Sequence, residues 1–452
     1  MIRHEDVDLL VIGWGKAGKT LAGVMARAGW RVALVERSSS MYGGTCINIA
    51  CVPTKDLIVS AEQRRESDDP ASFFADAVAA RDGLTARMRA ANHAMLADKV
   101  LLVDGVARFS GPRTVTVKAG NEELTLTGRF VVVNTGSRPR PLDVPGAELA
   151  LDSTTIQHIE PLPGRLAIIG GGFIAAEFAG MFAHFGSGVV VLGRGAFLPR
   201  LEPEIAVAAA EVLANQGVEV RTGVRVLGLR REGHEFVVST ETGEVRADAV
   251  LNATGRAPAT AGLDLHRAGV ATDERGFVLV DGHLRTSAEG VFAVGDVNGG
   301  PQFTYISWDD HRIVADQLLG EGRRHTGDRT AVPTVTFLTP PLAHVGMSKA
   351  EALASGRRLL AATVKVSDVA VAPRPKIVGR PEGLVSFVVD ADSDEILGAT
   401  LFCVDAQELI NLVSLAMRTG ATAQMLRDGI WTHPSSTELI SGALAALEPL
   451  IG

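Results

Sequence analysis

The chain has 452 residues, of which 46% are hydrophobic and 21% charged, a balance typical of a soluble globular α/β protein of about three domains. The formal net charge of −8 argues against a general nucleic-acid or anionic-membrane surface, because both require clustered lysine and arginine. No apolar run reaches the ~18 residues of a membrane helix and the N-terminus lacks a signal-peptide pattern, so we expect a cytoplasmic protein.

The first expected structural unit spans residues 8–37. It reads as an apolar strand, a turn with Gly13, Gly15 and Gly18, a helix, and a second strand that ends at Glu36. In such a unit the first glycine turns the chain, the second lets the backbone approach a pyrophosphate, and the third lets helix and strand pack closely. Because Glu36 is placed to accept hydrogen bonds from a ribose diol, we predict a dinucleotide site here and favour FAD.

Residues 41–55, MYGGTCINIACVPTK, hold Cys46 and Cys51. A structural zinc site needs about four ligands, and Cys403 and the eleven histidines show no suitable spacing. A static disulfide across so short a loop would constrain little of the unfolded chain. A redox-active pair is therefore favoured, and a helix beginning near Thr45 would lower the pKa of a thiol at its N-terminus.

Residues 164–194 repeat the first unit, with Gly170, Gly172 and Ala175 in the glycine positions. At the place that corresponds to Glu36 stands Gly193, followed by Arg194. An acid would repel a 2′-phosphate, whereas a glycine and a cation accommodate it. We therefore predict that the second site binds NADPH in preference to NADH.

Two matched strand ends and one acid complete the expected nucleotide sites. VVVNTGSRP at 131–139 and VLNATGRAP at 250–258 both end in Thr-Gly where a nucleotide domain returns to its sheet. The strand VFAVG is followed by Asp296, which is placed to accept hydrogen bonds from a ribityl hydroxyl. Taken alone, Gly-Asp is more often an ordinary turn.

A histidine is the expected partner for proton transfer to and from a thiol, since its ordinary pKa lies near neutrality. Among the eleven, only His433 in WTHPSSTELI has a suggestive setting, with Glu438 able to orient the ring. A lone histidine is more often structural, so the residues by themselves leave this role open.

Together, GGTCINIACVPTK, the two glycine turns, ATGR, VGD and the late HPSSTE resemble the class I flavoprotein disulfide reductases, which include glutathione reductase, dihydrolipoamide dehydrogenase and mercuric reductase. The resemblance covers nearly the whole chain in the family's order. GKAGKTLA, MYGGTCINI and QFTYISWDDHRIV are closest to a copper(II)-reducing branch that protects bacteria from reactive chlorine and is related to mercuric reductase. That branch keeps an acid near position 193 and favours NADH, so Gly193 is a departure, and the chain lacks the C-terminal cysteine pair of mercuric reductases.

The resemblance implies unequal cysteines, with Cys51 facing the flavin and Cys46 attacking the substrate. It implies that Lys55 lies near the flavin and pairs with Glu177, and that His433 and Glu438 come from the other subunit of a homodimer. It also implies a set of cofactor-binding residues: Gly13, Gly15, Gly18, Glu36, Gly44, Thr45, Lys55, Ala107, Thr135, Gly136 and Asp296 for the flavin, and Gly170, Gly172, Ala175, Gly193, Arg194 and Gly255 in the nicotinamide half.

The expected fold is α/β, with two Rossmann-like domains for FAD and NAD(P) and a C-terminal α+β dimerisation domain. We predict an FAD domain at 1–150 that resumes at 281–330, an NAD(P) domain at 151–280 and an interface domain at 331–452.

The resulting functional hypothesis is an NAD(P)H-dependent flavoenzyme that passes electrons through Cys46 and Cys51 to an oxidant or metal ion, with Cu(II) favoured. No resident metal site is predicted. The alternatives are reduction of a small disulfide related to glutathione or lipoamide, an activity like that of mercuric reductase, and a thiol redox sensor without a catalytic role.

Overall fold

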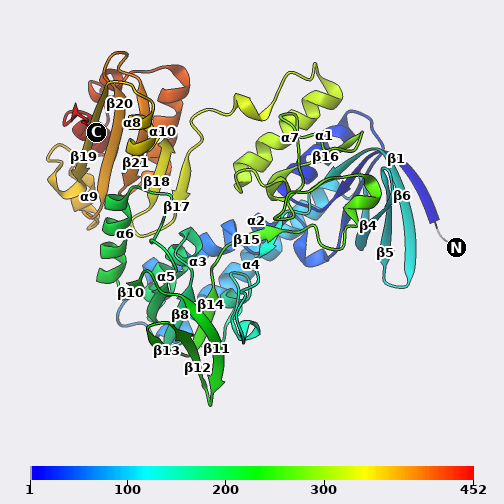
Figure 1. The fold of residues 1–452 in the computed structure, drawn as a ribbon, viewed down its shortest axis with the longest axis horizontal. Helices are drawn as coiled ribbons and strands as arrows, with labels where there is room; N and C mark the ends of the chain where they lie inside the picture. Colours follow the sequence, from blue (N-terminus) through cyan, green and yellow to red (C-terminus); the bar gives the residue numbers. More distant parts are fainter. Residues whose placement is uncertain (1–2, 452) are drawn as a thin grey trace.

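The computed structural model describes residues 3–451 and shows three sheet-centred regions (Figure 1). The first is a seven-stranded sheet of order β3-β2-β1-β6-β5-β4, in which β16 also pairs with β6. Its strands are β1 (Arg3–Ile12), β2 (Val32–Glu36), β3 (Leu101–Asp104), β4 (Val106–Gly111), β5 (Thr114–Ala119), β6 (Glu122–Val133) and β16 (Val291–Ala293).

Helices cover this sheet because its central strands are apolar on both faces. All five residues of β2 are buried, as expected for a parallel strand between two helical layers. Helix α1 (Lys16–Arg27) connects β1 to β2 and packs against α7 (Thr304–Leu319). The short return strand β16 carries the chain back to the first sheet after the second region.

The second region has a parallel sheet of order β10-β9-β8-β14 and an antiparallel sheet of order β11-β12-β13. Helix α5 (Phe173–Phe185) follows β8, and α6 (Pro203–Asn215) follows β9. The strands are β8 (Arg165–Ile169), β9 (Gly188–Leu192), β10 (Val218–Arg221), β11 (Val226–Glu232), β12 (Glu235–Thr240), β13 (Gly243–Ala247) and β14 (Ala249–Asn252). A two-stranded ribbon of β7 (Ser137–Pro139) and β15 (Arg256–Pro258) connects this region to the first.

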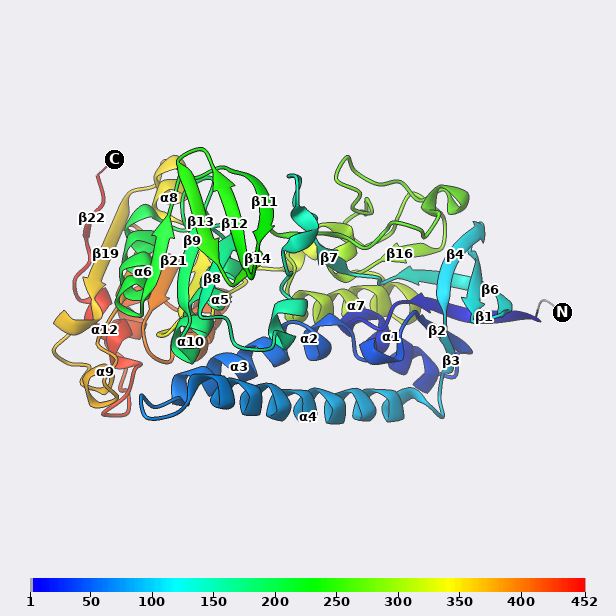
Figure 2. The same ribbon diagram turned by 90° about the horizontal axis from the view of Figure 1, so that it is seen from below.

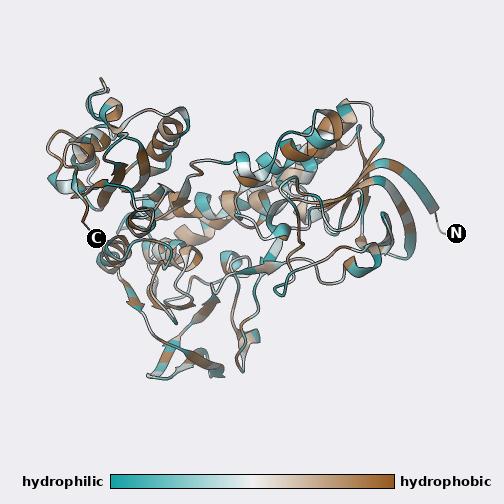
Figure 3. Cartoon of the chain, turned by 45° about the horizontal axis from the view of Figure 1, so that its top comes forward, coloured by the Kyte–Doolittle hydropathy of each residue, from teal (hydrophilic) through white to brown (hydrophobic). Residues whose placement is uncertain are grey.

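The C-terminal region is a six-stranded sheet of order β17-β18-β21-β20-β19-β22. Every residue of β21 is buried, and the strands of this sheet are mostly brown in Figure 3, in keeping with a core between sheet and helices. Its elements are β17 (Thr334–Thr336), β18 (Leu342–Gly346), α8 (Lys349–Ala354), β19 (Leu359–Lys365), α9 (Arg374–Ile377), β20 (Leu384–Asp390), β21 (Ile396–Phe402), α10 (Ala406–Thr419), α11 (Ala423–Arg427), α12 (Glu438–Leu444) and β22 (Glu448–Pro449).

Three helices carry the cysteine segment and support it. Helix α2 (Thr45–Asn48) and helix α3 (Cys51–Gln63) follow each other closely, and α4 (Pro70–Leu96) runs back beneath them along one side of the molecule (Figure 2). Helix α4 begins sharply because Asp69 accepts a hydrogen bond from the Ser72 amide at 2.9 Å and Pro70 occupies the first turn. The long helix thus forms a platform for the segment that holds both cysteines.

The predicted fold class is confirmed, since two Rossmann-like units and a C-terminal α+β region are present. Within residues 3–451, no helix has the length and apolar character needed to cross a membrane.

Candidate active site

The cysteine segment packs directly on the first glycine turn. Gly43 and Gly44 have φ of 93° and 80°, and a Cβ on Gly44 would lie 2.7 Å from the Cα of Gly15. A side chain at Gly44 would therefore separate the two loops. Helix α2 begins at Thr45, as the sequence indicated, and places Cys46 in its first turn, whereas Cys51 is the first residue of α3.

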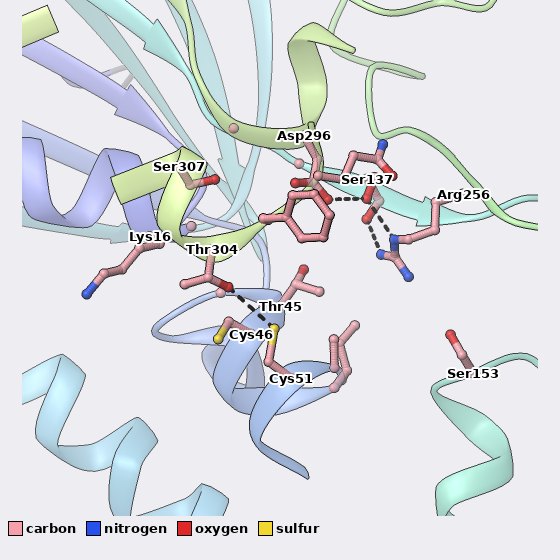
Figure 4. A pocket seen from close by; sticks show the side chains of 18 of the residues that line it. Lys16, Thr45, Cys46, Cys51, Ser137, Ser153, Arg256, Asp296, Thr304 and Ser307 are labelled. Atoms are coloured by element: carbon pink, nitrogen blue, oxygen red, sulfur yellow. Dashed lines mark hydrogen bonds between the residues drawn. The ribbon is translucent and has the colours of Figure 1, made fainter. Parts of the chain in front are cut away.

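Cys46 and Cys51 are not joined by a disulfide in this structure, and their surroundings make them unequal (Figure 4). A hydrogen bond from Cys46 lowers the pKa of Cys51 to about 6, and the Thr304 hydroxyl and the Lys55 charge act in the same direction, against the effect of burial. The Cys51 Sγ lies 3.4 Å from the Thr304 Oγ1. The same hydrogen bond, together with burial, raises the pKa of Cys46, so the first thiolate to form is Cys51.

A partly buried ion pair lies near Cys51 and connects three parts of the chain. The Lys55 Nζ in α3 is 2.6 Å from the Glu177 Oε2 in α5. The other carboxylate oxygen of Glu177 accepts a hydrogen bond from the Phe337 amide at 2.9 Å, directly after β17. The Lys55 ammonium also lies 4.9 Å from the centre of the Phe337 ring. With both Glu177 oxygens bonded, the buried carboxylate is compensated.

Glu36 is held rigidly at the end of β2. Its carboxylate accepts hydrogen bonds from the amides of Trp14 at 3.0 Å, Arg37 at 2.9 Å and Ser38 at 3.3 Å. Burial nevertheless raises its pKa, and these amides act in the opposite direction. The carboxylate is thus preorganised at the mouth of the glycine turn, where its remaining lone pairs suit a ribose diol.

In the first glycine turn, neighbouring protein atoms occupy the space that a Cβ would need, so only glycine fits. Gly13 has φ of 98°, and a Cβ there would lie 2.6 Å from the Asn134 carbonyl oxygen. Cβ atoms on Gly15 and Gly18 would meet the Asn134 side chain at 2.7 and 2.6 Å. Asn134, which follows β6, therefore fixes this turn and also donates a hydrogen bond to the Gly13 carbonyl at 3.1 Å.

The second glycine turn is different. Gly170, with φ of 133°, would place a Cβ 2.5 Å from the Ala253 carbonyl oxygen, but a Cβ on Gly172 would meet no atom within 4 Å. Ala175 is fully buried against the sheet. The open space at Gly172 is what a dinucleotide phosphate approaching the backbone requires.

Asp296 belongs to a network of hydrogen-bonded polar side chains. Its other members, Ser137 and Arg256, were not predicted from the sequence. Its carboxylate accepts a hydrogen bond from the Ser137 hydroxyl at 2.6 Å. Ser137 in turn accepts one from the Arg256 Nε at 2.8 Å, and its carbonyl oxygen accepts another from the Arg256 guanidinium at 2.7 Å (Figure 4). Both residues stand next to the matched Thr-Gly pairs, directly after Gly136 and Gly255, and that spacing is the signal that could have identified them.

A cavity of about 1690 Å³ joins these groups and extends from the first glycine turn past the cysteines to Gly172 and α10. The Thr135 hydroxyl at its wall is buried without a hydrogen-bond partner among the described residues, as expected for a group that meets a bound cofactor. The cavity brings together these predicted site residues: Gly13, Gly15, Glu36, Gly44, Thr45, Cys46, Cys51, Lys55, Ala107, Thr135, Gly136, Gly172, Glu177 and Asp296. It does not include Gly18, Gly170, Ala175, Gly193, Arg194, Gly255, His433 or Glu438.

The second unit has the buried Gly193 where the first has Glu36. The Gly193 amide donates to the Arg221 carbonyl at 2.8 Å, and its carbonyl accepts from Val224 at 2.9 Å, so its backbone is fixed. The Arg194 side chain is exposed next to it. Within the described residues 188–196, which form this strand end, no side chain carries a carboxylate.

His433 and Glu438 form a hydrogen-bonded pair on the outer surface of the C-terminal region. The His433 Nδ1 lies 2.8 Å from the Glu438 Oε1, and the Ser435 amide donates to the other carboxylate oxygen at 2.9 Å. The amide and the histidine lower the pKa of Glu438, so the carboxylate is charged and orients the ring. The His433 side chain is 66% exposed. The pair is therefore arranged for proton transfer but is absent from the cavity of its own chain.

Two family matches agree with this arrangement. The pyridine nucleotide-disulphide oxidoreductase family matches residues 7–310, and its dimerisation domain matches residues 332–444. The chain belongs to this family of FAD-dependent oxidoreductases, as its motifs indicated.

Individual relatives show which members of the family this chain resembles. The chain is 42% identical to the probable pyridine nucleotide-disulfide oxidoreductase RclA of Escherichia coli, over 96% of this chain and 97% of that protein. It is 34% identical to a mercuric reductase of Streptomyces lividans, over 98% and 96%. A solved structure described as the Cu(II) complex of the HOCl-induced flavoprotein disulfide reductase RclA matches with a TM-score of 0.93 and 41% identity, covering 98% of this chain and 99% of that one.

Proposed function

We propose that this chain is an NAD(P)H-dependent Cu(II) reductase that works through the Cys46 and Cys51 dithiol in defence against reactive chlorine. The observation that supports this most strongly is the pair of unequal cysteines in a cavity that extends to both glycine turns. The similarity to a reductase solved as its Cu(II) complex and described as HOCl-induced supports the choice of acceptor and role.

The residues of the site fit this chemistry. FAD, when bound, carries two electrons from the nicotinamide to the disulfide. Two electrons and two protons convert the Cys46–Cys51 disulfide into two thiols, and two Cu(II) ions then accept one electron each as the disulfide reforms and the two protons leave. Lys55 and Thr304 stabilise the Cys51 thiolate, and the role proposed for His433 of the partner subunit is to exchange the proton of Cys46.

The nicotinamide nucleotide is proposed to be NADPH. Gly193 leaves the position of a ribose-binding acid empty, and Arg194 adds an exposed cation beside it. A 2′-phosphate gains an ion pair there and meets no carboxylate in the described residues of this strand end.

We also propose a homodimer in the cytoplasm. The chain carries the family's dimerisation domain, and the His433 and Glu438 pair stands exposed, away from its own cysteines. We retain the division into 1–150 with 281–330, 151–280 and 331–452; the pairing of β16 with β6 supports the return segment.

The proposal is tested by measuring Cu(I) formation under anaerobic conditions with NADPH or NADH. We expect two Cu(I) per nucleotide oxidised, faster turnover with NADPH, and background rates in Cys51→Ser. Thr419→Ala, a change at the exposed end of α10, serves as a control and keeps the wild-type rate. Unchanged turnover in Cys51→Ser would reject the dithiol mechanism.

A panel of acceptors separates the alternatives. Turnover of glutathione disulfide or lipoamide without turnover of Cu(II) would replace the metal by a small disulfide. If the protein consumed no NAD(P)H with any acceptor, the chain would be a redox sensor and not an enzyme.

A further inference from the structure

Lys19 does not point toward the glycine turn that begins its helix. From the second turn of α1, its ammonium donates a hydrogen bond to the Gly43 carbonyl oxygen at 3.2 Å and another to the Asn92 side chain in α4. The side chain is half-buried and does not line the large cavity. Lys19 therefore connects α1, α4 and the loop that leads into Cys46.

A second side chain of α4 completes this support. The Arg89 Nε donates to the Asn48 side chain at 2.9 Å, and the Asn48 amide donates to the carbonyls of Tyr42 and Gly44, both at 2.9 Å. With the contact from Lys19, the three consecutive carbonyl oxygens of residues 42–44 all accept hydrogen bonds from side chains. The loop that leads into Cys46 is thereby fixed against α4.

Each of the two cysteines is influenced by the positive charge of a different lysine. The cation that stabilises the Cys51 thiolate is Lys55. The hydrogen bond to Cys51 and burial raise the pKa of Cys46, whereas the Thr304 hydroxyl and the charge of Lys19 act in the opposite direction. Burial and the neighbouring Lys16 lower the pKa of Lys19 itself to about 8, while Cys46 acts in the opposite direction. Lys19 is thus charged at neutral pH and responds to the charge of Cys46.

We propose that Lys19 is a positioning residue for the substrate-facing sulfur: it fixes the loop in front of Cys46 and supplies positive charge to the Cys46 thiolate after the disulfide has opened. The assignment of Cys46 as the sulfur that meets the substrate rests on the proposed function. Opening the disulfide takes two electrons and one proton if one sulfur remains a thiolate; loss of that proton leaves Cys46 charged as well. A cation nearby favours this second thiolate.

The test uses the reduced holoenzyme and iodoacetamide, whose carbon is attacked by a thiolate with loss of iodide. The alkylation rates of Cys46 and Cys51 are measured separately by peptide mass spectrometry between pH 6 and 9. Lys19→Met keeps the aliphatic chain and removes the charge, so we expect alkylation of Cys46 to slow about tenfold at pH 7, the effect of one pKa unit. The difference should shrink above about pH 8, because Lys19 then loses its own proton.

Other ionisable groups nearby define the controls. Lys16 lies on the same helix, Cys51 faces Cys46 from α3, and Arg89 and His93 belong to α4. Lys19→Arg should restore most of the rate. Lys16→Met removes the same charge one turn away, where the ammonium lies 4.1 Å from the Trp308 ring centre and not at the loop, and should change the rate less than about twofold.

Superimposable pH profiles for Lys19→Met and the wild type would overturn the proposal. An equal loss of rate at Cys51 would also overturn it, because displacement of the whole segment would then explain the effect. Alkylation uses no electron acceptor, so a failure of Cu(II) turnover leaves this test intact.

Discussion

At the scale of single residues, the proposed chemistry depends on the different pKa values of two cysteines five positions apart. Cys51 receives hydrogen bonds from Cys46 and Thr304 and the charge of Lys55, and its pKa falls to about 6. Cys46 donates a hydrogen bond to Cys51 and keeps its own proton, because this hydrogen bond and burial raise its pKa. Near neutral pH, the reduced site therefore holds one thiolate, at the sulfur near the partly buried ion pair.

Removal of the Thr304 hydroxyl should weaken this inequality. Thr304→Val preserves the shape of the side chain but removes a hydrogen bond to a charged sulfur, so the apparent pKa of Cys51 should rise by about one unit. The thiolate of the reduced protein is present above its pKa and lost below it, so the variant should show a smaller ultraviolet thiolate absorbance at pH 7. Thr304→Ser restores the hydroxyl and should restore the titration; an unchanged midpoint in Thr304→Val would contradict the role of this contact.

The sequence indicated the candidate reacting residues but not the groups that change their pKa values. Cys46 and Cys51 stand in a specific motif, and Lys55 and Glu177 were paired through a family resemblance. Thr304 lies 253 positions from Cys51, and only the packing of α7 against the first sheet brings the two together. No local pattern contains such a contact.

At the scale of elements, two glycine turns with one motif have different physical reasons for their glycines. The first turn is closed by Asn134, whereas the second keeps open space at Gly172. The motif predicted both strand-turn-helix units correctly. It did not reveal Asn134, because this residue enters the turn from β6, more than a hundred positions away.

Within the second turn, Gly170 and Gly172 differ in the space around them, and this predicts opposite outcomes for two alanine substitutions. Gly170→Ala forces a Cβ to 2.5 Å from a backbone oxygen at a φ of 133°, so it should cost about 1–3 kcal/mol and lower the melting temperature. Gly172→Ala meets no protein atom and should leave the melting temperature unchanged. It should instead weaken NADPH binding about tenfold in a fluorescence titration, because the Cβ occupies the space of the phosphate. Wild-type affinity in Gly172→Ala would contradict the placement of the nucleotide.

At the scale of the whole molecule, we propose that a second chain completes the active site. The cavity contains the cysteines, the ion pair and both glycine turns, yet the His433 and Glu438 pair lies outside it. The sequence could predict the pair itself, because five positions separate its members at the start of α12. The proposal that the pair lies next to the cysteines of a second chain came only from the family resemblance. The spacing of residues within one chain carries no information about contacts between two chains.

Mixed dimers test whether two chains share the site. Cys51→Ser and His433→Gln should each abolish turnover of a disulfide acceptor or Cu(II). In a mixed dimer, one of the two sites receives Cys51 from one chain and His433 from the other, so co-expression with random pairing should recover about one quarter of the wild-type rate. An inactive mixture of two inactive variants would mean that His433 serves the cysteines of its own chain.

The most direct test of the account is the number of thiols that the protein exposes on denaturation. The chain has three cysteines, and Cys403 is fully buried in the C-terminal region, away from the active-site pair. A thiol titration of the denatured oxidised enzyme should find one thiol per chain, and anaerobic treatment with NADPH before denaturation should raise this to three. The same number before and after NADPH would contradict a working Cys46–Cys51 disulfide.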